Sequence, residues 1–134
     1  FLLMSFHGIP QRNVDLGDPY QEQCQRTAKL LAQALELEDV EWQISFQSRL
    51  GKAQWLQPYT DKTVRTLAER GIKTLDIVAP SFATDCLETL EELDTEAAEI
   101  FYEAGGEKFS YVPCLNSNKK HVSLLVELVG RHLH

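Results

Sequence analysis

The sequence predicts an α/β domain, in which a four-stranded parallel sheet carries helices on both faces in a doubly wound arrangement. Short apolar runs rich in β-branched residues alternate four times with longer stretches of helical periodicity. Such alternation is typical of right-handed βαβ units and a parallel sheet. The 134 residues contain no linker and no internal repeat beyond this alternation, and they are enough for one core. We therefore predict a single domain over residues 1–134.

The expected strands cover residues 1–7, 40–47, 72–79 and 108–113. The third strand is strongly apolar, as an inner parallel strand requires, and Pro80 stops it because proline has no N–H to donate. The expected helices run over about residues 18–35, 60–70, 85–104 and 121–131. Capping residues indicate their starts and glycines end two of them. The caps are Asp18, Thr60, Thr84 or Asp85, and Asn118, and the glycines are Gly71 and Gly105.

The simplest sheet order for these elements is 2-1-3-4. This order places the topological switch between the first and third strands, where ligands bind in open α/β sheets, outside the carboxyl ends of the strands. The turn after His7 and the turn after Pro80 then share one crevice. We expect the chemistry of the protein in this crevice.

Composition and charge exclude several classes of protein. A net charge of −7 argues against a nucleic-acid partner, which needs clustered Lys and Arg. No apolar run is long enough for a transmembrane helix, and the opening F-L-L-M-S-F lacks a basic flank, so it reads as a buried strand instead of a signal peptide. Because the chain starts inside this strand, we expect it to be part of a longer protein. Its widely spaced cysteines argue against a disulfide framework, a structural zinc or a cluster, and they suit a reducing cytoplasm: Cys24, Cys86 and Cys114.

His7 closes the first strand and is followed by Gly8 and Pro10. A histidine at this end of a strand is well placed as a proton acceptor or a metal ligand. The structural alternative is a histidine whose hydrogen bonds only stabilise the loop. The remaining histidines lie on or after the last helix, and we read them as surface residues: His121, His132 and His134.

The loop from Ser48 to Leu56 mixes cations with an aromatic residue. Arg49 and Lys52 can meet carboxylates of a ligand, while Trp55 and Leu56 can pack on an apolar ring. The structural alternative is a loop whose Trp and Leu side chains anchor it to the core.

On the third helix, an apolar stripe and an acidic face are expected. The stripe consists of Leu87, Leu90, Leu93, Ala97, Phe101 and Ala104. Most of the glutamates suit a solvated face, but Glu88 lies in the first turn, nearest the crevice, and Glu92 lies one turn further. A line of carboxylates suits a divalent cation in transit or the removal of protons. Cys86, near the helix start, is read as a packed thiol.

Three ordered blocks resemble ferrochelatases, which insert ferrous iron into protoporphyrin IX. They are L-L-M-S-F-H-G-I-P-Q-R-N-V-D-L-G-D-P-Y, F-Q-S-R-L-G-K-A-Q-W-L-Q-P-Y-T-D and F-A-T-D-C-L-E-T-L-E-E-L. The resemblance covers essentially the whole chain, but only the carboxyl-terminal half of the family's usual length, and it favours the bacterial type. It implies that His7 is the active-site histidine, that Glu88 is the catalytic glutamate, and that Glu92 continues the acidic line.

The resemblance also implies the substrates, the site and the partners. His7, Glu88 and Glu92 are the expected metal ligands, and Ser5, Arg49 and Trp55 are the expected substrate-binding residues. Fe²⁺ and protoporphyrin IX are substrates, and we expect no tightly bound cofactor and no iron–sulfur cluster, since the cysteine-rich tail of animal members is missing. The amino-terminal half would supply the other wall of the porphyrin cleft, so we expect little turnover by this chain alone. We expect a cytoplasmic protein, with peripheral contact at the inner membrane left open.

Two alternatives stay open at this point. The chain can belong to a non-catalytic carrier of porphyrin or metal, which would tolerate the loss of His7 or Glu88. It can also belong to a related chelatase that inserts cobalt into another tetrapyrrole. Which of His7 and Glu88 is the base and which binds the metal does not follow from the sequence.

Overall fold

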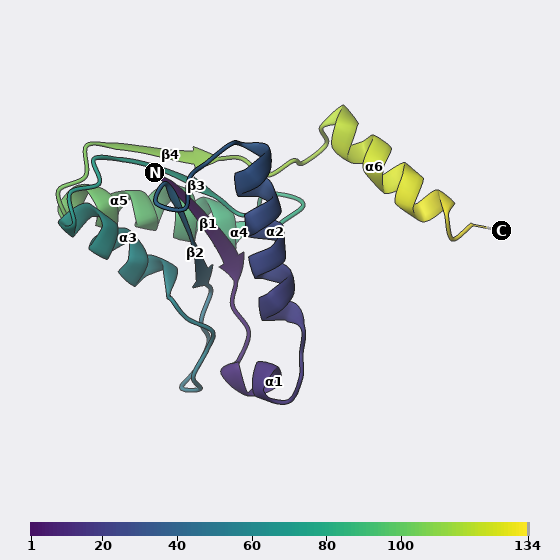
Figure 1. The fold of residues 1–134 in the computed structure, drawn as a ribbon, viewed down its shortest axis with the longest axis horizontal. Coiled ribbons are helices and arrows are strands. Elements are labelled where there is room, and N and C mark those ends of the chain that lie inside the picture. Colours follow the sequence, from purple (N-terminus) through teal and green to yellow (C-terminus); the bar gives the residue numbers. More distant parts are fainter. Residues whose placement is uncertain (134) are drawn as a thin grey trace.

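A computed structural model, which describes residues 1–133, contains a four-stranded parallel sheet flanked by helices (Figure 1). The strands are β1 (Leu2–His7), β2 (Trp42–Gln47), β3 (Thr74–Val78) and β4 (Lys108–Val112). Their order is β2-β1-β3-β4, and all three strand pairs are parallel. The predicted fold class and sheet order are therefore confirmed, and the carboxyl ends of β1 and β3 lie at the same edge of the sheet.

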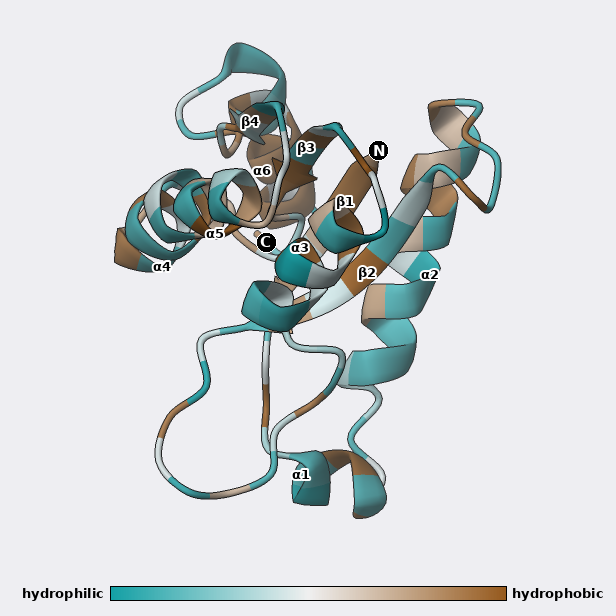
Figure 2. Ribbon diagram, turned by 90° about the vertical axis from the view of Figure 1, so that its left-hand side faces the viewer, coloured by the Kyte–Doolittle hydropathy of each residue, from teal (hydrophilic) through white to brown (hydrophobic). Residues whose placement is uncertain are grey.

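Helices cover both faces of the sheet. In chain order the helical segments are α1 (Gln11–Asp15), α2 (Tyr20–Ala34), α3 (Thr60–Glu69), α4 (Leu87–Thr89), η1 (Leu90–Glu96), α5 (Ala97–Glu103) and α6 (Lys119–Gly130). Successive residues of β1 point to opposite faces, so Leu3 packs in the core that α3 and α5 cover, while Met4 packs in the core that α2 covers. In Figure 2 most of the ribbon of α2 and α3 has the colours of hydrophilic residues.

The first helical region begins differently from the prediction. A short helix, α1, precedes α2, and the Asp18 carboxylate accepts a hydrogen bond from the Tyr20 backbone N–H at the start of α2. Thr60 opens α3 as expected, but its side chain does not cap the helix. Its hydroxyl is buried and faces the sheet, where it bonds Ser5 and Ser45.

The predicted α-helix over residues 85–104 is interrupted by a π-helix, η1, between α4 and α5. In a π-helix each turn holds an extra residue, which rotates the preceding segment relative to the following one. The buried positions consequently recur every four residues: Thr89, Leu93, Ala97 and Phe101. The predicted burial of Leu87 and Leu90 is wrong, because these side chains are 70% and 47% exposed.

Two further features lie outside the central sheet. The last helix, α6, starts at the predicted cap Asn118, whose side chain accepts a hydrogen bond from the Lys120 N–H, and it projects away from the sheet (Figure 1). Below the sheet, α1 and the loop after β2 lie side by side (Figure 2), joined through Pro10 and Trp55. Within residues 1–133, no helix is both long and apolar enough to cross a membrane.

Candidate active site at the carboxyl ends of the strands

The end of β1 brings His7 against β2 and the loop that follows it. The N–H of Gly8 donates to the carbonyl oxygen of Gln47 at 2.8 Å. A Cβ atom at Gly8 would lie 2.9 Å from this oxygen and 3.2 Å from the Trp55 ring. Glycine is therefore required here for close approach to β2 and Trp55.

The ring of His7 has a defined orientation. Its Nδ1 lies 2.6 Å from the carbonyl oxygen of Gly8, which can only accept a hydrogen bond. In the neutral ring Nδ1 must carry the hydrogen, so the lone pair is on Nε2. The rings of Phe82 and Trp55 lie near the imidazole, with centroids 6.0 Å and 6.5 Å from it. His7 thus has its lone pair on Nε2, and aromatic rings from two loops lie near the imidazole.

The backbone of His7 is held by two side chains that sequence analysis missed. Its N–H donates to the Ser81 hydroxyl at 3.1 Å, and its carbonyl accepts from the Tyr20 hydroxyl at 2.8 Å. Burial, with a smaller contribution from Cys24, raises the pKa of Tyr20 to about 12. Tyr20 therefore stays protonated at neutral pH and can remain the donor. The available signal in the sequence was the position of Tyr20 at the end of the first block that resembles ferrochelatases, Leu2 to Tyr20.

Glu88 lies in the first turn of α4 and is partly exposed. Hydrogen bonding with the Cys86 side chain and with its own backbone N–H lowers the pKa of Glu88, and a smaller electrostatic contribution from His7 acts in the same direction. His7 ends β1 and Glu88 follows β3 in the chain, and these two strands pair, so both residues lie beyond the same edge of the sheet.

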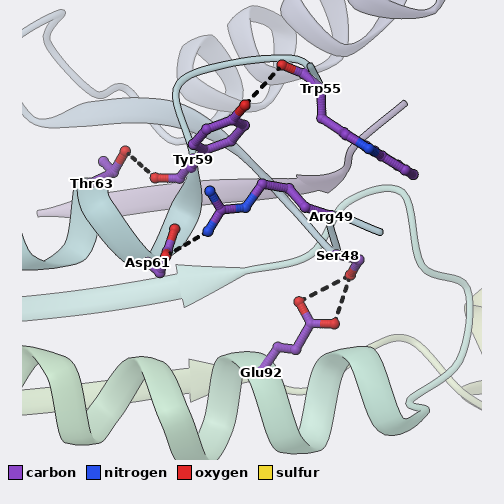
Figure 3. Close-up of polar contacts among 7 residues, drawn as sticks. All are labelled: Ser48, Arg49, Trp55, Tyr59, Asp61, Thr63 and Glu92. Atoms are coloured by element: carbon purple, nitrogen blue, oxygen red, sulfur yellow. Dashed lines mark hydrogen bonds and ion pairs between the residues drawn. The ribbon is translucent and has the colours of Figure 1, made fainter. Parts of the chain in front are cut away.

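Glu92 follows in η1, where the Ser48 hydroxyl lies 2.9 Å and 3.0 Å from its two carboxylate oxygens (Figure 3). Burial raises the pKa of Glu92, and the charges of Glu96 and Glu88 add to this, although hydrogen bonds from Ser48 act in the opposite direction. A cavity of about 210 Å³ adjoins Glu92 between β2, α3 and α5. The pKa values of Glu88 and Glu92 are thus shifted in opposite directions.

The loop after β2 is anchored more strongly than predicted. The Arg49 guanidinium pairs with Asp61 at 2.7 Å and lies 4.0 Å from the centre of the Tyr59 ring (Figure 3). Leu56 is fully buried, which is the outcome expected from the structural alternative, a loop anchored to the core. Trp55 stays partly exposed, and its indole N–H donates to the Leu50 carbonyl at 3.0 Å. The Lys52 side chain is exposed, and the ligand contacts predicted for Arg49 and Trp55 stay predictions.

Ser5 cannot contact a substrate, and this prediction is wrong. Its side chain is fully buried in the middle of β1, and its hydroxyl bonds Gln47 and Thr60 at 2.8 Å each. The inner strand of a parallel sheet is covered on both faces, so only its last residue reaches the crevice.

The prediction of a surface position for His121 is also wrong. Its side chain is buried, and Nδ1 lies 2.8 Å from the carbonyl oxygen of Asn116. His132 is exposed as expected, while His134 lies outside the described residues. In the part of the chain that the structure describes, no three His, Cys, Asp or Glu side chains are grouped as a preformed metal site.

Asp85 holds the segment before Glu88 in place, but it is not the helix cap, which is Cys86. The Asp85 carboxylate accepts hydrogen bonds from the Tyr111 hydroxyl at 2.6 Å and from the Asn116 amide at 2.7 Å. These bonds, the one from Asn116 first, hold the pKa of Asp85 far below its usual range. The cysteine side chains nearby, at 86 and 114, are free thiols.

The fold defines an open parallel α/β domain with a candidate site at its topological switch, and comparisons with known proteins assign it more closely. A solved structure of a putative cobalamin (vitamin B12) biosynthesis CbiX protein from Marinobacter aquaeolei has the same fold, with a TM-score of 0.58 and 14% identity over 98% of this chain and 94% of that one. The ferrochelatase family profile matches residues 1–133. The chain therefore belongs to the ferrochelatase family.

Curated relatives agree with this assignment. The ferrochelatase of Aeromonas hydrophila is 57% identical over 98% of this chain, and that of Acinetobacter baumannii is 54% identical over the same share. The chain spans 41% and 39% of the lengths of these two proteins. The resemblance expected from the three sequence blocks is confirmed, including the limited share of the family's length.

Proposed function

We propose that this chain is the part of a ferrochelatase that carries the reacting side chains, and that the whole protein inserts Fe²⁺ into protoporphyrin IX and releases two protons. The observation that carries the proposal is the position of a basic imidazole nitrogen at the end of β1, and of two carboxylates with opposite pKa shifts in α4 and η1, at the switch point of the sheet. Pairs of titratable groups whose pKa values are pushed apart are typical of sites that transfer protons.

The shifted pKa values divide the roles among the side chains. Two pyrrole N–H protons must leave as the cation enters the ring, and Nε2 of His7 is the available acceptor for one of them. Glu88, with its lowered pKa, stays ionised and attracts the cation, whereas Glu92, with its raised pKa, holds protons more readily. In the proposed path the cation contacts these three side chains one after another.

The loop after β2 supplies the proposed contacts to the porphyrin. Trp55 lies beside His7 and remains partly exposed, so it can pack on the macrocycle and help to hold it out of plane. Arg49 is the proposed partner for a porphyrin carboxylate. Its side chain and that of its present partner Asp61 are 37% and 46% exposed, so an incoming carboxylate can compete for the guanidinium at small cost.

The rest of the longer protein is the proposed partner of α6. This helix projects from the sheet and presents apolar side chains that are 43% to 66% exposed: Val122, Leu124, Leu125, Val126, Leu128 and Val129. Large exposed apolar patches mark interaction sites. We propose that the missing segment covers this surface and forms the second wall of the cleft, so that the present chain alone has little turnover. We further propose a cytoplasmic location with peripheral contact at the inner membrane, no resident cofactor and no iron–sulfur cluster.

The test is anaerobic insertion of Fe²⁺ into protoporphyrin, followed by absorbance, with the protein at the full length that its coding sequence specifies. The variants are His7→Ala and, as a matched control, His132→Ala at an exposed histidine. We expect loss of insertion only in His7→Ala, with both variants folded. Porphyrin binding without insertion by the unaltered protein would favour a carrier, and faster insertion of Co²⁺ than of Fe²⁺ would favour a cobalt chelatase.

A further inference from the structure

A chain of buried polar side chains crosses the domain beneath the crevice. Ser45 on β2, Thr60 on α3 and Ser5 on β1 are all buried, with exposed fractions of 0%, 4% and 0%. Thr60 Oγ1 lies 2.9 Å from Ser45 Oγ and 2.8 Å from Ser5 Oγ. Ser5 Oγ in turn lies 2.8 Å from Oε1 of Gln47, whose side chain is 3% exposed. Gln47 is therefore the last buried side chain of this row, next to the crevice.

The number of hydrogens on each group fixes the direction of every bond. The Glu88 carbonyl can only accept, so the Gln47 amide turns Nε2 toward it, at 2.6 Å, and Oε1 toward Ser5. The single hydroxyl hydrogen of Ser5 is then used on Oε1, which requires Thr60 to donate to Ser5 and Ser45 to donate to Thr60. All bonds run in one direction, from Ser45 to Glu88, and bonds aligned in this way polarise one another.

Gln47 joins the two sides of the crevice. Its backbone carbonyl accepts the N–H of Gly8, the residue next to His7, at 2.8 Å. Its side-chain amide donates to the carbonyl of Glu88, in the short helix α4. One residue at the end of β2 thus contacts the segments that carry both predicted catalytic groups. The hydrogen bond from the Ser5 hydroxyl, the last of the hydroxyl bonds described above, fixes the rotamer of the Gln47 side chain.

We propose that Gln47 is a positioning residue that sets the separation of His7 and Glu88. Gln47 is 3% exposed, where it lines the cavity beside Glu92, and its contacts with the candidate site are the backbone hydrogen bonds at Gly8 and Glu88. The inference rests on the proposed chelatase function. Because misplacement of reacting groups by about 1 Å can cost on the order of 10²-fold in rate, loss of the amide should reduce turnover more than binding.

The test compares Gln47→Leu with Thr63→Val in the full-length protein. Thr63 is also buried, and its hydroxyl donates to the Tyr59 carbonyl at 2.8 Å on α3, without a link to Glu88 (Figure 3). We expect Gln47→Leu to lower kcat for metal insertion by about tenfold or more, with the KM for porphyrin changed by less than about twofold. Thr63→Val should lose a similar amount of thermal stability and keep kcat within about twofold.

Gln47→Glu supplies a second, nearly isosteric variant. A protonated carboxyl can donate to the Glu88 carbonyl and accept from Ser5, whereas an ionised carboxylate cannot donate. Burial raises the pKa of a carboxyl, so the protonated form becomes accessible as the pH falls. We expect the kcat of Gln47→Glu, relative to the unaltered protein at the same pH, to rise as the pH falls. This variant tests the proposal even when Gln47→Leu does not fold.

A spectroscopic measurement separates this inference from the proposed reaction. The ¹³C NMR shift of the Glu88 carbonyl reports its hydrogen bond from Gln47 whether or not the protein is active. We expect this shift to change in Gln47→Leu and not in Thr63→Val. If the shift changes in Gln47→Leu but the unaltered protein inserts no metal, the result contradicts the proposed function and leaves the hydrogen bond from Gln47 to Glu88 intact as a finding. An unchanged shift, or a kcat for Gln47→Leu equal to that of Thr63→Val, overturns the role of Gln47.

Discussion

Replacing Asp85 with Asn tests how the segment before Glu88 is held. The Asp85 carboxylate accepts from Tyr111 at 2.6 Å and from Asn116 at 2.7 Å, and more weakly from the Cys114 N–H and the Thr89 hydroxyl, both at 3.2 Å. An amide in its place still offers one oxygen to Tyr111, but its NH₂ group faces the NH₂ group of Asn116. The variant loses one charge-assisted hydrogen bond and weakens another.

The magnitude follows from these bonds. A hydrogen bond to a charged group contributes about 1.5–3 kcal/mol and a neutral one about 0.5–1.5 kcal/mol. Because Asp85 is only partly buried, we expect Asp85→Asn to lower the free energy of unfolding by about 2 kcal/mol at pH 7. For a chain of this size the melting temperature falls by about 6–8 °C. Urea and thermal unfolding of the 134-residue chain measure both quantities.

The effect has a predicted pH dependence. Because the pKa of Asp85 is lowered in the folded state, its stabilisation is complete above the unfolded pKa of about 3.9 and is lost as the pH falls further. The difference between the unaltered chain and Asp85→Asn should therefore shrink below about pH 4. Asp94→Asn, at an exposed aspartate of η1, is the control. A loss below about 0.5 kcal/mol at pH 7, or a difference that stays constant below pH 4, would refute the reasoning.

Three further substitutions test the site. Gly8→Ala places a Cβ atom 2.9 Å from a β2 carbonyl oxygen, and we expect a loss of about 1–3 kcal/mol in unfolding and a lower kcat; unchanged kinetics would contradict the required close approach. Tyr20→Phe removes the donor to the His7 carbonyl and should cost about 1 kcal/mol in urea unfolding, so an unaltered stability would exclude that bond as a support. Ser48→Ala removes the bonds that oppose the effect of burial on Glu92, so its pKa should rise further in a ¹³C NMR titration, and a fall would contradict this assignment. A carboxyl with a raised pKa in the folded state makes stability fall as the pH rises through that pKa. The stability of Ser48→Ala should therefore continue to fall up to a higher pH than that of the unaltered chain.

The sheet could be predicted because its signals are local. Each strand is a short apolar run next to a turn residue, and alternation with helices leaves few topologies for a parallel sheet. The π-helix could not be predicted in this way. The spacing of Leu87, Leu90 and Leu93 fits the 3.6-residue period of an α-helix, so hydropathy alone places all three residues in the buried stripe. The observed stripe includes Thr89, a polar residue that hydropathy alone does not place in a core.

The edge of the sheet at which the candidate site lies could be predicted for the same reason. His7 and Glu88 lie at the ends of elements, and the sheet order alone brings these ends together. The predicted contact between Ser5 and a substrate is wrong because a residue in the middle of an inner strand is covered on both faces. Tyr20 and Gln47 act through hydrogen bonds to residues far away in the sequence, and no local pattern indicates such partners.

The projecting helix α6 has a consequence for every measurement on the isolated chain. A helix of 12 residues is marginal in water without packing, and its exposed side chains from Val122 to Val129 are mostly apolar. Two copies can bury these side chains against each other, so the isolated chain should self-associate as its concentration rises. Unfolding then includes dissociation, and the melting temperature depends on protein concentration by mass action. Variants of the isolated chain are therefore comparable only at matched concentration, or after deletion of the residues that follow Asn118.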